Sequence, residues 1–166
     1  VGAIGDIQNK GRNKSFTGLN LHVLEDAKQT GLIDIVNDLN FSSIKPINEA
    51  IAYSNDFKLP GLSNDVNRTL KYLQTTFVFM ENSEGKIRSL SELDQEEKQK
   101  ISAAIIEYAN IKLNIEPSEI IKKLIVNKHL LPNERSYVEL YDTREFSYIL
   151  NSCGRTNNAS IGIALA

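Results

Sequence analysis

Two capping boxes constrain the fold of this chain most strongly, because each of them fixes the start of a helix. Asp94 is followed three residues later by Glu97, and Asp142 is followed at the same spacing by Glu145. Side chains in this pattern satisfy backbone N–H groups that the first turn of a helix leaves unpaired. Apolar residues then recur at intervals of three and four, the period of an amphipathic helix. The sequence therefore predicts a helix after each box.

Other helix and turn signals indicate a mainly α chain with short β segments. Pro46 and Pro117 suit the first turns of helices, and Gly31 suits a helix end. Ser63 suits an N-cap. Further helices are predicted over residues 17–30, 32–39, 46–54, 63–77 and 117–131. Extended segments are predicted over residues 1–5, 77–90 (as a hairpin) and 135–141.

The composition is that of a soluble globular protein and excludes several classes of function. The 166 residues are 41% hydrophobic and 24% charged, and the net charge is −2, so there is no general signal for nucleic acid or membrane binding. One cysteine excludes an internal disulfide. It fits a reducing compartment, hence a cytoplasmic protein, or simply a packing position. No apolar run approaches the ~20 residues of a membrane span, so no membrane partner is predicted.

Both ends of the sequence are apolar runs, whereas natural termini are usually polar and frayed. We therefore expect the chain to be an internal fragment of a larger protein.

The run Asn151–Arg155 is expected to present a charge at a fixed point. An apolar stripe before it places Cys153 inward as a small hydrophobic residue. Gly154 is predicted to take the left-handed conformation that ends the helix, so that Arg155 emerges just past its end. The guanidinium can then bind a phosphate or the carbonyls of its own helix, and the pattern favours neither. Asn151 lies off the stripe and can face a ligand or cap carbonyl groups.

Asp6 follows the predicted strand 1–5 directly. A carboxylate at the carboxyl end of a strand is a natural ligand for a hard metal ion, although the spacing alone favours a residue that only caps a turn. The loop after it carries Lys10, Arg12 and Lys14, which can contact phosphates or remain solvated. His22 is predicted to lie at the surface, because no second ligand follows at metal-binding spacing, and His129 is equally isolated.

The two ends of the chain resemble the RecJ-type nucleases of the DHH phosphoesterase superfamily. The run Asn151–Arg155 is similar to the Asn-Ala-Ala/Cys-Gly-Arg element of that family, and Val1–Asp6 resembles its fourth catalytic motif, a strand that closes on a metal-binding aspartate. Segments 45–47, 59–63 and 142–146 resemble the archaeal branch, which separates these two motifs by a helical insertion.

This resemblance implies a helical insertion and connector between the end of an α/β DHH domain and the start of a DHHA1 domain. Residues 1–15 would be the edge of the DHH catalytic domain, comprising the motif strand and its loop. Connector helices would occupy 16–40, the insertion domain 41–133, and a connector helix with the start of the DHHA1 domain 134–166.

The resemblance also implies an activity, the exonucleolytic hydrolysis of single-stranded DNA or RNA with Mn²⁺ or Mg²⁺. By motif match, Asp6 would be a catalytic metal ligand, and Arg155, Asn151 and Gly154 would bind the nucleic acid. The other metal-binding motifs of the family lie outside this sequence. We therefore expect the fragment alone to bind no metal and to be inactive.

A second function stays open beside the nuclease. The family includes a eukaryotic replication factor that has lost catalysis and serves as a scaffold in the helicase, and archaeal members can associate with the GINS complex of the replisome. The parent protein can thus be a metal-dependent exonuclease or a replication scaffold. In both cases the resemblance implies that the helical insertion carries protein contacts.

Overall fold

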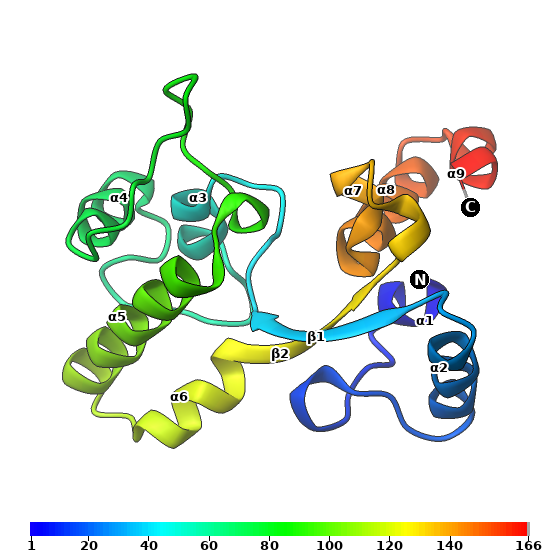
Figure 1. Ribbon diagram of the computed structural model, residues 1–166, viewed down its shortest axis with the longest axis horizontal. Helices are drawn as coiled ribbons and strands as arrows, with labels where there is room; N and C mark the ends of the chain where they lie inside the picture. Colours follow the sequence, from blue (N-terminus) through cyan, green and yellow to red (C-terminus); the bar gives the residue numbers. More distant parts are fainter. Residues whose placement is uncertain (166) are drawn as a thin grey trace. The chain divides into compact units, whose positions relative to one another are not determined.

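A computed structural model describes residues 1–165 and divides into two compact units (Figure 1). The first unit comprises Val1–Asp38 and the described residues from Asn127 onward, and the second comprises Leu39–Val126. Helices dominate both units, which confirms the predicted mainly α fold with short β segments. Among the described residues, no helix has the length and apolar character needed to cross a bilayer.

The first unit is built mainly from short helices. Its elements in chain order are α1 (Gly2–Gly5), a 3₁₀ turn (Arg12–Lys14), α2 (Leu19–Gln29), β1 (Asp34–Leu39), β2 (Ile125–Leu130), a 3₁₀ turn (Pro132–Glu134), α7 (Val138–Tyr141), α8 (Thr143–Arg155) and α9 (Ala159–Leu165). Helix α8 packs against α1, α7 and α9. Apolar burial is sparse here, so polar contacts carry much of the packing.

The second unit has an apolar core of its own. Its helices are α3 (Ile47–Ala52), α4 (Val66–Gln74), α5 (Gln95–Leu113) and α6 (Pro117–Leu124), with a 3₁₀ turn at Leu90–Glu92. Helix α3 packs against α4, and α5 packs against α6. The largest fully buried side chains of the unit include Phe41, Ile47, Ile51, Leu59, Leu62, Leu73, Leu90, Ile101, Ile105, Ile120 and Leu124.

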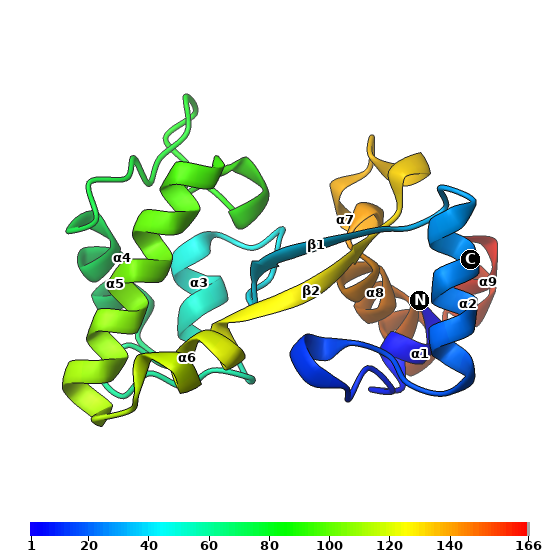
Figure 2. The same cartoon turned by 60° about the horizontal axis from the view of Figure 1, so that its bottom comes forward.

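The sheet consists of β1 and β2, which pair antiparallel and lie side by side in both views (Figures 1 and 2). The border between the two units falls inside both strands. The helices predicted over 32–39 and 117–131 are therefore wrong for the residues that form these strands. β-Branched residues such as Ile35 and Val126 suit an extended, paired backbone, and each strand finds its partner far away in sequence.

Two predicted extended segments are helical instead. Residues 2–5 form α1, where the Asp6 N–H donates to the Gly2 carbonyl at 3.0 Å. The described sheet offers them no strand to pair with, so a helical turn satisfies their backbone groups locally. Residues 135–141 include α7, and the carbonyl of its last residue, Tyr141, accepts the Leu131 N–H at 2.8 Å.

The helix caps follow the sequence closely, with one replacement. Asp94 and Glu97 form the predicted box, in which Asp94 Oδ1 accepts from the Glu97 N–H at 2.8 Å and Glu97 Oε2 accepts from the Asp94 N–H at 2.9 Å. Asp142 caps α8 through the Arg144 N–H at 3.0 Å. Asp65 caps α4 in place of Ser63, whose hydroxyl accepts the Leu59 N–H at 2.8 Å and so fastens the preceding turn.

The predicted hairpin at 77–90 is present in reduced form. Glu81 and Ile87 make an isolated antiparallel bridge, and the Arg88 N–H donates to the Met80 carbonyl at 2.8 Å. Asn82 closes the turn, because its side-chain oxygen accepts from the N–H groups of Glu84 and Lys86.

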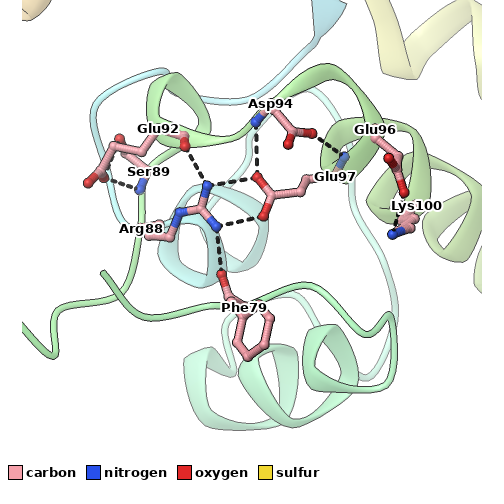
Figure 3. A network of polar contacts seen from close by, with 8 residues as sticks. All are labelled: Phe79, Arg88, Ser89, Glu92, Asp94, Glu96, Glu97 and Lys100. Atoms are coloured by element: carbon pink, nitrogen blue, oxygen red, sulfur yellow. Dashed lines mark hydrogen bonds and ion pairs between the residues drawn. The ribbon is translucent and has the colours of Figure 1, made fainter. Parts of the chain in front are cut away.

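Arg88 ties this hairpin to the start of α5 (Figure 3). Its two terminal nitrogens lie 2.7 Å from the two carboxylate oxygens of Glu97, and both side chains are mostly buried. The same nitrogens donate to the carbonyls of Phe79, at 2.9 Å, and Glu92, at 2.5 Å. The hydrogen bond from Arg88 holds the pKa of the Glu97 carboxyl below its usual range. A bidentate pair of this kind is strong and fixes geometry as well.

We predict that Glu97→Gln lowers the free energy of unfolding by about 2 kcal/mol, because it removes the charge from a bidentate pair while leaving an oxygen to cap α5. Urea unfolding followed by circular dichroism measures the loss. Glu96→Gln is the matched control, since Glu96 pairs with Lys100 on the exposed side of the same helix. Its unfolding midpoint should stay almost unchanged, and an equal loss in both variants would contradict the prediction.

We predict that the lowered pKa values of Glu92 and Glu97 make the protein less stable in acid. The pKa of Glu97 is lowered by Arg88, and the pKa of Glu92 is lowered by the Ser89 N–H, both from an ordinary value of 4.5. Because the folded state holds these protons less tightly, their stabilisation is complete above that value and is lost as the pH falls below it. Glu97→Gln should therefore show a shallower decline in acid than the unchanged chain.

Candidate functional site

The helix that carries the predicted binding residues ends later than the sequence indicates. Helix α8 continues through Gly154 to Arg155 and is capped at Thr156, and Asn157 takes the positive φ of 60°. The prediction that Gly154 ends the helix is wrong, because asparagine also tolerates the left-handed conformation and supplies it three residues later. Arg155 is therefore the last residue of the helix rather than a residue beyond it.

Helix α1 lies along one stripe of α8. A Cβ built on Gly5 would stand 3.5 Å from Asn151 Nδ2 and 3.7 Å from Ser147 Cβ. Because Ser147, Asn151 and Arg155 follow one another at intervals of four, they share one face of the helix. The structure thus brings the residue before Asp6 against Asn151 and places Arg155 on the stripe that faces α1.

Asp6 itself is exposed and forms the C-cap of α1. Its backbone N–H closes the short helix, so the turn-capping role that the sequence leaves open belongs to its backbone. Among residues 1–165, no group of three or more histidine, cysteine, aspartate or glutamate side chains is arranged to hold a metal ion. Asp6 can contribute a single carboxylate.

The loop after Asp6 is tightly folded around Gly11. The Gly11 N–H donates to the Ser15 carbonyl at 2.9 Å, and a Cβ on Gly11 would collide with the Ser15 hydroxyl. Asn13 and Lys14 both adopt positive φ values. The loop thus presents Arg12 at the surface on a constrained backbone.

The sequence gives no sign of a buried ion-pair cluster at the centre of the first unit. The Lys128 ammonium lies 3.6 Å from a carboxylate oxygen of Asp142 and 3.8 Å from one of Asp38, and the side chains of all three are largely buried. They come from β2, from the start of α8 and from β1. No local pattern could reveal this cluster, because its members are distant in sequence and each reads as an ordinary surface charge.

The two histidines differ in their surroundings. His22 is exposed and lies 3.7 Å from Glu25, as predicted for a surface residue. His129 is 3% exposed, its ring lies 5.2 Å from that of Phe16, and its carbonyl accepts from the Thr143 hydroxyl at 2.8 Å. Burial lowers its pKa, which keeps the imidazole neutral. His129 is therefore a packing residue next to the Lys128 cluster.

The comparisons with known proteins concern the second unit. A family model described as the DHH-CID domain matches residues 42–125, slightly more than half of the chain. This chain belongs to the DHH-CID family. A search of curated proteins finds no match.

The DHH-CID domain is a helical insertion of DHH proteins, and the second unit, with its four helices, has that character. The family places the chain in the DHH superfamily of RecJ-like proteins. This superfamily includes phosphoesterases, and its functions are related to nucleic acids. The match does not reach Asp6, Asn151, Gly154 or Arg155, so their roles stay predictions.

We predict that Asp142→Asn lowers the free energy of unfolding by about 3 kcal/mol. The amide oxygen can still cap α8, but the buried Lys128 loses a negative partner, and breaking a buried ion pair from one side is costly. Urea unfolding measures the change, with Asp34→Asn on β1 as the exposed control. Equal midpoints for the two variants would show that the cluster does not stabilise the unit.

Proposed function

We propose that this chain is part of a metal-dependent exonuclease, an archaeal, GINS-associated member of the RecJ-like DHH proteins. It would hydrolyse phosphodiester bonds in single-stranded DNA or RNA in the cytoplasm. The DHH-CID match carries the proposal, because this insertion belongs to DHH proteins. The contact between Gly5 and Asn151 supports it, since it joins the two segments that resemble the nuclease motifs.

Asp6 would supply one ligand to Mn²⁺ or Mg²⁺ in the full-length parent. The bound metal ions would activate water and stabilise the displaced oxygen. The remaining ligands would come from other parts of the parent, because the described residues contain no group of three or more side chains that could hold a metal ion. The chain alone would then be inactive and hold no metal.

Arg155 and Asn151 would bind the nucleic acid from α8. A guanidinium suits the charge of a phosphate, and the Asn151 amide can donate to an oxygen of the backbone. Arg155 is exposed and makes no ion pair with the described residues. Gly154 has no atom within 4 Å of the position that a Cβ would occupy, so this side of the helix leaves room for a strand to approach.

The second candidate function is a replication scaffold, with GINS or other replisome proteins as partners. The observation that favours it is the separate apolar core of the second unit. A unit with its own core can present a fixed surface without help from a catalytic domain. The two functions are compatible, because the insertion can dock partners while the remainder of the parent cleaves nucleic acid.

We predict that Asp6→Ala in the full-length parent abolishes cleavage of single-stranded DNA in the presence of Mn²⁺. The side chain is exposed, so its loss should leave the circular dichroism spectrum and thermal midpoint unchanged. Asp26→Ala, another exposed aspartate of the first unit, is the control and should cleave normally. Unchanged cleavage by Asp6→Ala would remove Asp6 from the metal site.

We predict that Arg155→Ala weakens the binding of single-stranded DNA by the parent. It should also flatten the slope of log K against log salt by about 0.7, the contribution of one phosphate contact on a single strand. Fluorescence anisotropy over a salt series measures both quantities. Arg135→Ala removes the same charge from another exposed position of the first unit and should have little effect. Equal effects of the two substitutions would show that Arg155 acts only through the net charge of the protein and makes no specific contact with a phosphate.

A further inference from the structure

The second unit exposes two phenylalanines within residues 77–81, which we name the aromatic edge: Phe77 lies in the turn after α4, and Phe79 lies on the short segment 78–81 that leads into the hairpin. Phe77 is 91% exposed and Phe79 is 84% exposed. Val78 and Met80, which alternate with them, are buried in the apolar core. This alternation is that of a strand with one face on a core. Two phenyl rings that are close in sequence and left in water favour a further burial event.

The backbone of the aromatic edge is firmly held. Val78 and Met80 anchor it from inside, and the Arg88 guanidinium donates to the Phe79 carbonyl at 2.9 Å (Figure 3). Phe77 adopts a φ of 59°, which is unusual for a bulky residue and requires the surrounding structure to enforce it. The rings are thus presented on a preorganised backbone, which lowers the entropy cost of binding.

One side of this segment has unused hydrogen-bonding groups. Met80 and Asn82 bond inward across the hairpin, to Arg88 and Lys86. On the opposite side, the N–H of Phe79 and both the N–H and the carbonyl of Glu81 have no hydrogen-bond partner among residues 1–165. Such groups at the edge of a paired segment form a template for another extended chain.

Charge selects the kind of chain that fits this template. Glu81 is exposed, follows Phe79 by two residues and has no cationic partner among the described residues. Its carboxylate favours a lysine or arginine on the incoming chain and repels a phosphate backbone. The edge therefore fits a protein segment better than a nucleic acid.

We propose that the aromatic edge is a docking site for an extended segment of another protein. That segment adds as a strand, packs apolar side chains against Phe77 and Phe79, and places a basic residue opposite Glu81. This inference deepens the docking role proposed above and rests on it, while it is independent of the nuclease activity.

The test uses the whole chain and an array of synthetic extended peptides in which apolar and polar residues alternate and one end carries lysine. We expect a subset of these peptides to bind and to shift the amide resonances of Phe79 and Glu81 in ¹⁵N nuclear magnetic resonance spectra. N-methylation of the peptide amides that face the edge should abolish binding, because it removes the strand hydrogen bonds.

Substitutions in the chain locate the site. The double variant Phe77→Ala with Phe79→Ala should bind the selected peptide at least about tenfold more weakly, as expected for a central aromatic anchor. Ile111→Ala removes an exposed apolar side chain from α5 of the same unit and should leave binding unchanged. Glu81→Lys should weaken the binding of the peptide that carries lysine. A peptide with glutamate in place of that lysine should bind the variant again.

Four results would overturn the proposal. The first is that no peptide of the array shifts the amides of the edge. The second is that binding persists in the double phenylalanine variant. The third is that a short oligothymidylate, and no peptide, shifts these amides, which would make the edge a nucleic-acid surface. If the full-length double variant loses no association with GINS, the docking role stands but belongs to another surface of the second unit, and this proposal fails.

Discussion

Lys128 places its ammonium between the carboxylates of Asp38 and Asp142, and the position of α8 depends on that contact. Asp142 both faces the buried cation and caps the helix that carries Asn151 and Arg155. With few buried apolar side chains in this unit, the burial of three charges has to be offset by their mutual attraction and hydrogen bonds. The candidate nucleic-acid residues therefore owe their placement to a polar cluster a few turns away from them.

In the second unit, apolar packing holds the helices in place. Its core runs through all four helices, and its charged contact between Arg88 and Glu97 lies at the border of that core. Glu97 also completes the capping box of α5, so one side chain both caps a helix and binds Arg88 of the hairpin. The carbonyl of Phe79 is a third partner of the same arginine. Stability and the presentation of the aromatic edge thus share one network.

The sequence predicts the helix boundaries that are determined by interactions within one turn of the chain. The box at Asp94, the proline at 117 and the glycine at 31 each mark a real helix boundary, because capping and backbone conformation are decided within a turn. The sequence did not predict the strands β1 and β2, since the partner of each lies on the other side of the helical insertion. It did not predict the buried ion pairs of Lys128 for the same reason. The partners of Lys128 come together only once the two strands and α8 are in place.

Gly154 lies inside the helix that it is predicted to end. Glycine inside a helix costs about 1 kcal/mol relative to alanine, and an alanine would meet no atom here within 4 Å. Neither backbone conformation nor packing therefore requires glycine at this position. The continuation of the helix through Gly154 keeps Arg155 in line with Asn151, on the stripe that α1 covers further up. Close approach of a nucleic-acid strand is a role that would make use of a missing side chain at this point.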